Sequence, residues 1–213
     1  MKFIQKGPEP QEFLEWKNQA NDDWKPTYSD LGGSVKKALK NGLMLDQGFL
    51  CCYCEAELTV DESHIEHFRP QSDPHVDALD YSNLLCSCQN NLKKGTPLRC
   101  GNLKGDWFDS ELLISPLDPT CETRFTFTAD GYIHPAETDD GAAIKTIEKL
   151  GLDIPELRAL RSNAIEPFLL ISGDEEMGIE DIQTFVKGYL QPSEDGKFSE
   201  FWTTIRYLFK EYV

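Results

Sequence analysis

Long apolar runs, internal repeats and low-complexity segments are all missing from this chain of 213 residues. No apolar stretch approaches the length of about 18 residues that a membrane-spanning helix needs, so we expect no membrane span. The first residues contain no apolar run long enough for a signal peptide, which predicts a cytoplasmic protein. No self-similarity appears at periods of about 20 to 50 residues, and this excludes solenoids and propellers.

Basic side chains are scarce, since 21 lysines and arginines stand against 37 acidic residues and give a net charge of −16. Phosphate binding depends largely on cationic side chains, so a broad basic surface for nucleic acid is excluded. Residues 1–50 are balanced, residues 51–110 carry −5 and residues 111–213 carry −11. The last segment would repel phosphate. It is either a solvated face or a docking surface for a basic partner.

Cysteines are few and odd in number, seven in all, which fits a reducing compartment better than a disulfide scaffold. Cys51 and Cys54 form a CxxC pair, from which two thiolates can reach one tetrahedral metal ion. A second pair must close the site, and we favour Cys88 with Cys100 over Cys86 with Cys88. The eleven residues between Cys88 and Cys100 then form an inserted loop. The alternative is that these cysteines are small buried apolar side chains.

Between the cysteine pairs, the segment 64–67 holds two histidines and a carboxylate within four residues. A Glu-His dipeptide can place its carboxylate on a divalent metal while the neighbouring imidazole activates water. A polar strand with incidental histidines is the alternative. It loses weight beside the CxxC pair and with Asn83 sixteen residues after His67. The pattern therefore favours a hydrolytic metal site.

This combination resembles the HNH nucleases, whose ββα-metal core carries Glu-His or Asp-His on its first strand. It is more closely similar to PtuB, the HNH subunit of the Septu antiphage systems, which also occurs with some retrons. The matching segments run almost end to end. The most specific of them are His-Ile-Glu-His-Phe-x-Pro, Asn-Leu-Leu-x-Ser-Cys and Cys-Gly-Asn-x-Lys-Gly.

The resemblance implies a role for each residue of these motifs. His67 would be the general base, and Glu66 would bind the catalytic Mg²⁺ or Mn²⁺. Asn83 would hold the loop of the base, and Asn102 would be the second metal ligand. His64 would either bind the metal or support a group that does.

The expected fold is α+β, with a zinc-stabilised ββα-metal nuclease core in residues 51–110. Residues 1–50 would be a helical extension, with a first helix that starts near Pro10 and a second over about 34–47. Residues 111–213 would form a β-hairpin turning at 130–131 and then helices, a region suited to docking a partner. We also expect a short hairpin over 58–65 and a helix that opens at 82–85. The four cysteines would hold a structural Zn²⁺.

Phosphate contacts are hard to find in this sequence. The only basic cluster near the expected site consists of Lys93, Lys94, Arg99 and Lys104. These are the best available contacts, although a solvated loop explains the first two equally well. We therefore expect another chain to supply much of the affinity for substrate.

The expected function is metal-dependent hydrolysis of phosphodiester bonds in nucleic acid, with DNA favoured by the resemblance. The resemblance also implies an ABC-type ATPase partner similar to PtuA and a role in antiphage defence. One alternative is a nuclease for structured RNA in a retron-type toxin effector. Another is a zinc-dependent binding module without catalysis, but the intact histidines and glutamate favour the enzyme.

Overall fold

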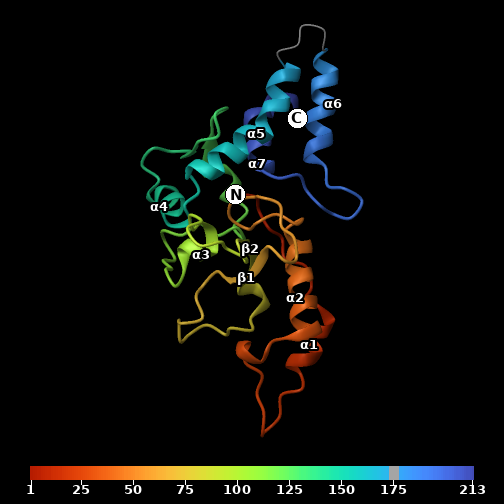
Figure 1. The fold of residues 1–213 in the computed structure, drawn as a ribbon, viewed down its shortest axis with the longest axis vertical. Helices are drawn as coiled ribbons and strands as arrows, with labels where there is room; N and C mark the ends of the chain where they lie inside the picture. Colours follow the sequence, from red (N-terminus) through yellow and green to blue (C-terminus); the bar gives the residue numbers. More distant parts are fainter. Residues whose placement is uncertain (173–177) are drawn as a thin grey trace.

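The computed structural model describes residues 1–172 and 178–213, and these form an α+β structure with two separate two-stranded antiparallel sheets (Figure 1). No helix in these two ranges is both long enough and apolar enough to cross a bilayer. In chain order the helices and strands are α1 (Gln11–Lys17), α2 (Gly33–Asp46), β1 (Ser63–His67), β2 (Leu84–Cys88), α3 (Cys100–Lys104), β3 (Phe125–Phe127), β4 (Ile133–Pro135), α4 (Gly141–Leu150), α5 (Pro155–Ser172), α6 (Ile179–Leu190) and α7 (Trp202–Leu208).

The first sheet and the short helix after it occupy the middle of the molecule (Figure 1). Strands β1 and β2 pair so that Glu66 lies opposite Leu85 and His67 lies opposite Leu84. All five residues of β2 are buried, and α3 packs against this strand. The order β1, β2, α3 is the order of elements that the HNH resemblance implies.

Two local expectations in this region were wrong. Residues 58–65 do not form a hairpin, because β1 begins at Ser63 and pairs with the distant β2. The segment 82–85 does not open a helix. It forms the end of a single 3₁₀ turn and the start of β2. The Asp80 side chain caps this turn by accepting from Ser82 N. A short apolar run such as β2 has no periodicity that separates a buried strand from a helix.

The N-terminal segment is tied to β2 by one buried side chain. Helix α2 starts one residue before the expected helix and packs on β2. Directly after α2, the Gln47 Oε1 accepts from Cys86 N at 2.7 Å and its Nε2 donates to Cys86 O at 2.9 Å. This side-chain amide pairs with the free edge of β2 as another strand would, and it satisfies buried backbone groups.

The C-terminal half contains the expected hairpin and a set of helices. Strands β3 and β4 join through a turn in which Gly131 has a φ of 86°, a value that favours glycine. Helix α4 ends at Gly151 in the left-handed conformation. Helices α5 and α6 lie side by side at the end of the molecule away from α1 (Figure 1). With α7 they enclose a second small core of Ile165, Phe168, Ile182, Val186, Leu190, Ile205 and Phe209.

A buried carboxylate connects three distant parts of the chain. Glu55 follows the CxxC turn, and its Oε1 lies 2.7 Å from the α-amino group of Met1. Its Oε2 accepts from Thr203 N in α7 at 2.8 Å. Burial alone would raise the pKa of the Glu55 carboxyl, but the amino group and Thr203 hold it below its ordinary value. The ionised form therefore stabilises the packing of both chain ends on the central region.

Replacing Glu55 with glutamine should lower the free energy of unfolding by about 3 kcal/mol, because an unpaired ammonium group remains buried. Glu57→Gln, at an exposed neighbouring position, is the matched control. The pKa of Glu55 in the folded chain lies below its ordinary value of 4.5. The stabilisation is therefore fully present above pH 4.5 and is lost as the pH falls through the folded-state pKa. Urea titrations should therefore show a large gap between wild type and Glu55→Gln at pH 7 that narrows towards pH 3. A constant gap would contradict this account.

Candidate functional site

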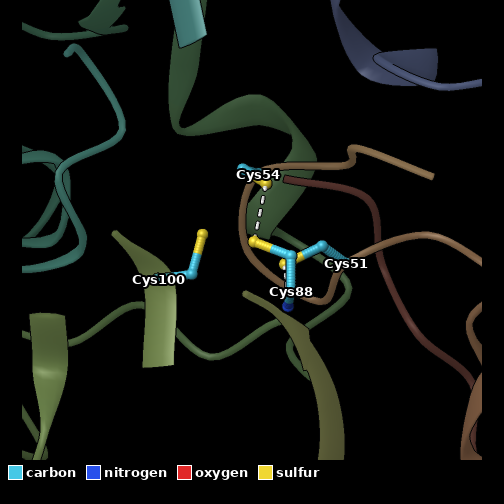
Figure 2. A group of neighbouring side chains, drawn as sticks. All are labelled: Cys51, Cys54, Cys88 and Cys100. Carbon is cyan, nitrogen blue, oxygen red and sulfur yellow. Dashed lines mark hydrogen bonds between the residues drawn. The ribbon is translucent and has the colours of Figure 1, made fainter. Parts of the chain in front are cut away.

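Four buried cysteines from three segments meet beside the central sheet (Figure 2). Cys51 and Cys54 lie on the turn before β1, Cys88 ends β2 and Cys100 begins α3. All four sulfurs lie within 4.8 Å of one another, and the sulfurs of Cys54 and Cys88 are 3.8 Å apart. A tetrahedral ion with Zn–S bonds of about 2.3 Å separates its sulfurs by about 3.8 Å. The cluster could thus hold a metal such as zinc.

The structure brings Cys100, and not Cys86, to this cluster. The Cys86 thiol instead points to the carbonyl of Lys40 at 3.7 Å. The inserted loop is closed at its base by Gln89, which donates to Pro97 O and accepts from Arg99 N, both at 2.9 Å. Because this one side chain holds both ends of the loop together, the length of the insertion does not keep Cys88 and Cys100 apart.

The chemistry of the cluster favours a bound cation. Burial raises the pKa of the Cys100 thiol, and the neighbouring thiols raise it further. A thiol that is protonated without a metal must give up its proton on binding one, so metal binding releases protons and strengthens as the pH rises. Arg99 adds positive charge, because its guanidinium bonds to Cys88 while its buried Nε has no partner among the described residues. Arg99 is thus directed to the thiols instead of to the open phosphate-binding position expected for it.

Arg99 should contribute to metal retention, because its charge offsets that of a four-thiolate site. Arg99→Ala is expected to speed zinc loss to a chelator by about 10- to 100-fold, the usual effect of removing a group that supports metal ligands. Lys93→Ala, on the exposed part of the same loop, is the matched control. Release can be followed with a colorimetric zinc indicator. Equal rates for the two variants would leave Arg99 without this role.

Glu66 and His64 project from β1 toward the start of α3. The Glu66 Oε2 lies 3.6 Å from His64 Nε2, while its Oε1 contacts Lys104 Nζ at 2.9 Å and accepts from Tyr53 OH at 3.1 Å. Burial would raise the pKa of Glu66, but His64 and Lys104 outweigh it and lower the value. The carboxylate is therefore ionised at neutral pH.

A glycine in α3 makes room for this pair. A Cβ at Gly101 would lie 2.3 Å from Glu66 Oε2 and 2.9 Å from His64 Nε2. Any side chain at this position would displace both groups. The Nδ1 atom of His64 is buried and has no hydrogen-bond partner among the described residues.

The ring of His67 is held on three sides. Its Nε2 lies 2.9 Å from Ala78 O, and a carbonyl can only accept, so this nitrogen carries the proton. The lone pair is then on Nδ1, which accepts from Gln71 Nε2 at 3.1 Å. The ring of Tyr28 packs edge-on, with centroids 4.6 Å apart. Burial lowers the pKa of His67, which keeps the imidazole neutral and able to take a proton at pH 7.

Asn83 fastens the chain directly after His67. Its Oδ1 accepts from Arg69 N at 2.8 Å and its Nδ2 donates to Arg69 O at 2.9 Å. Both polar ends of the amide are therefore used on a single residue. This contact fixes the start of the loop that supplies Gln71 and Ala78 to the His67 ring.

Two other residues of the expected site have partners that the sequence did not indicate. The Asn102 Nδ2 donates to Gln89 O at 2.7 Å at the base of the inserted loop. The Lys104 side chain is only 1% exposed and is paired with Glu66, so it is not an open phosphate contact. Both residues still line the cleft of about 380 Å³ that contains His64, Glu66, His67 and Gln71.

Sequence reasoning missed Tyr28, Tyr53, Gln71 and the Ala78 carbonyl. Tyr53 carried a signal, because it lies inside the CxxC turn. Tyr28 carried none, since it is far from the motif in sequence and reaches His67 only through the fold of the N-terminal segment.

No protein-family profile matches the chain. The chain is 36% identical over 145 residues to the "Retron Vc95 putative HNH endonuclease" of Vibrio cholerae serotype O1 biovar El Tor, an alignment that covers 64% of this chain and 68% of that protein. The chain belongs to the retron HNH endonuclease family. It is also 28% identical over 208 residues to the "Retron Ec83 putative HNH endonuclease" of Escherichia coli, covering 79% and 80% of the two chains.

Membership of the retron HNH endonuclease family agrees with the site described above. Both relatives carry names that support a nuclease role. The broader resemblance to HNH nucleases is thereby confirmed at the level of the family.

Proposed function

We propose that this chain is an HNH endonuclease that hydrolyses phosphodiester bonds of nucleic acid in an antiphage complex of the Septu or retron type. One observation carries the proposal. A neutral imidazole with its lone pair on Nδ1 shares one cleft with an ionised carboxylate and a second histidine, those of His67, Glu66 and His64. A base beside a potential cation site is what hydrolysis of a phosphodiester requires.

In the proposed reaction His67 accepts a proton at Nδ1 from the attacking water. Gln71 donates to that atom here, so the water would take the place of the Gln71 amide. The Ala78 carbonyl holds the ring through Nε2–H and stabilises the imidazolium that forms. These contacts fix both the tautomer and the direction of the base.

Glu66 and His64 fit a divalent cation such as Mg²⁺ or Mn²⁺, because Glu66 is ionised and its Oε2 and His64 Nε2 are 3.6 Å apart. Such an ion would neutralise charge on the scissile phosphate and on the leaving oxygen. Lys104 pairs with the other oxygen of Glu66, Oε1, and fixes the orientation of the carboxylate, with Oε2 beside His64. We assign the second ligand to His64 in preference to Asn102, because His64 Nε2 lies beside Glu66 Oε2 while the Asn102 Nδ2 holds the side chain to Gln89 O.

The four-cysteine cluster would hold a structural Zn²⁺. Four thiolates complete a tetrahedral shell and leave no position for substrate. Cys100 begins α3, and Gly101 follows it against Glu66 and His64. The cluster would therefore set the position of α3 relative to the catalytic residues.

We further propose an ABC-type ATPase as partner and DNA as the preferred substrate. The net charge of −16 makes independent binding of nucleic acid weak, and the segment 111–213 offers acidic helices to a basic partner. A nuclease for structured RNA is the second candidate. The two relatives are named after retrons, and the same chemistry cleaves the backbone of DNA or of RNA.

The test is incubation of the purified chain, with and without the ATPase, with duplex DNA and structured RNA in Mg²⁺, Mn²⁺ or chelator. We expect DNA cleavage that needs the metal, is weak for the chain alone at about 0.15 M salt and rises when the ATPase is added. Preferential cleavage of RNA would favour the second candidate. Cleavage of neither polymer by the complex would reduce the chain to a binding module, and efficient cleavage by the chain alone would remove the need for a partner.

A further inference from the structure

The fold leaves the proposed nuclease with few of the phosphate contacts expected from its sequence. Lys104 is buried against Glu66, and Arg99 is directed to the cysteine cluster. Lys93 and Lys94 remain exposed on the inserted loop. Another cationic surface beside His67 would supply the missing contacts to substrate phosphates.

The N-terminal segment reaches His67 through an aromatic contact. Tyr28 lies in a 3₁₀ turn before α2, and its ring meets the His67 ring at 76° with centroids 4.6 Å apart. Burial raises the pKa of Tyr28 to about 12, so the phenol is neutral and adds no negative charge. Lys36 Nζ lies 5.9 Å from the centroid of the same tyrosine ring. Positive charge therefore lies one ring away from the base.

The lysines at this position are free to bind an anion. Lys36 and Lys37 are exposed, and within residues 1–172 and 178–213 neither forms an ion pair. Lys40, one turn later, is engaged by the carbonyls of Val60 and Ser63.

The local charge differs in sign from that of the whole chain. Residues 25–45 carry four lysines and a single acidic residue, in a protein with a net charge of −16. That acidic residue, Asp30, is turned back onto Thr27 by two hydrogen bonds. The segment is thus a cationic surface next to the cleft, whereas the rest of the chain is acidic.

Resting on the proposed function, we infer that Tyr28, Lys36 and Lys37 form a surface that binds the phosphate backbone of the nucleic-acid substrate and leads it to His67. Each strand carries one negative charge per about 3.4 Å of helix axis. A strand with its scissile phosphate at His67 therefore places a neighbouring phosphate within reach of Lys36, which lies over the Tyr28 ring, and Lys37 is the next exposed residue of α2. Backbone contacts set position and carry no sequence information, so the effect should be the same for all sequences.

The test compares two charge reversals of equal size in the full chain. Lys36→Glu with Lys37→Glu alters the proposed surface, while Lys187→Glu with Lys210→Glu alters exposed lysines of the C-terminal region. Binding of a fluorescent DNA duplex is measured by anisotropy in a His67→Ala background, at salt from about 20 to 200 mM. Cleavage kinetics are measured in the active chain with the ATPase present, at the lowest salt. Circular dichroism and zinc content check that each variant folds.

We expect the Lys36/Lys37 reversal to weaken binding and raise KM by at least about 10-fold, with kcat nearly unchanged at saturating substrate. The slope of log affinity against log salt should fall by about 1.8, since two phosphate contacts are lost. If the two double variants lose the same amount of DNA affinity, the effect is due to net charge, and the proposed binding surface is wrong. An active wild type with an unaffected Lys36/Lys37 variant would also overturn it. A wild type that neither binds nor cuts at the lowest salt with the ATPase present would overturn the proposed function itself.

Discussion

Cys100→Ser and Cys88→Ser are each expected to lose zinc and the folded structure of the central region. Structural zinc in small domains contributes about 10–16 kcal/mol, comparable to or above the whole stability of a typical domain of about 5–15 kcal/mol. Here the metal would be the main link between the CxxC turn, the end of β2 and the start of α3. Metal analysis and thermal unfolding, with and without chelator, measure the effect.

The matched control is Cys86→Ser, which changes an equally buried thiol that points to Lys40 O and not to the cluster. We expect this variant to keep its zinc and to lose only modest stability. Zinc loss in Cys86→Ser together with full retention in Cys100→Ser would show that the ligand set in solution differs from the cluster in the structure.

His67→Ala is expected to lower kcat by about 10² to 10⁴-fold, the usual cost of removing a general base. The fold should survive, because the ring lies at the edge of the cleft and the strand contacts of residue 67 are made by its backbone. Single-turnover cleavage with the ATPase present, at saturating Mg²⁺ or Mn²⁺, separates this loss from weaker binding. His75→Ala, an exposed histidine in the following loop, is the control and should cleave like wild type.

His64→Ala should act differently from His67→Ala. If His64 binds the divalent cation with Glu66, its loss raises the Mg²⁺ or Mn²⁺ concentration needed for half-maximal cleavage, and excess metal restores part of the rate. In His67→Ala, the cleavage rate should not be restored by any concentration of Mg²⁺ or Mn²⁺. A His67→Ala chain that cuts normally beside an inactive His64→Ala chain would reverse the two roles.

Much of the central region could be predicted from short motifs. The chemistry of a CxxC pair or of a Glu-His dipeptide belongs to the residue types and their local spacing, so the sequence pointed to Cys51, Cys54, Glu66 and His67. The turn at residues 130–131 and the helix end at Gly151 were also predictable, because glycine at these positions tolerates a positive φ that other residues avoid.

The partners that come from far along the chain were not predictable. The sequence left Cys86 and Cys100 as competing candidates, and the structure decides between them through Gln89, which closes the loop before Cys100. Lys104 and Asn102 were expected to face the substrate or the metal, yet Lys104 pairs with Glu66 and Asn102 bonds to Gln89 O.

The sequence by itself determined that this chain carries a CxxC pair able to bind a metal and a Glu-His dipeptide of the kind used in hydrolytic sites, because both are local arrangements of reactive groups. Only the tertiary structure decided that Gly101 leaves space for His64 beside Glu66, and that Lys36 and His67 lie against the same Tyr28 ring. Contacts between segments that are distant in sequence depend on how loops close and how buried side chains pack. Local spacing contains no information about those distances.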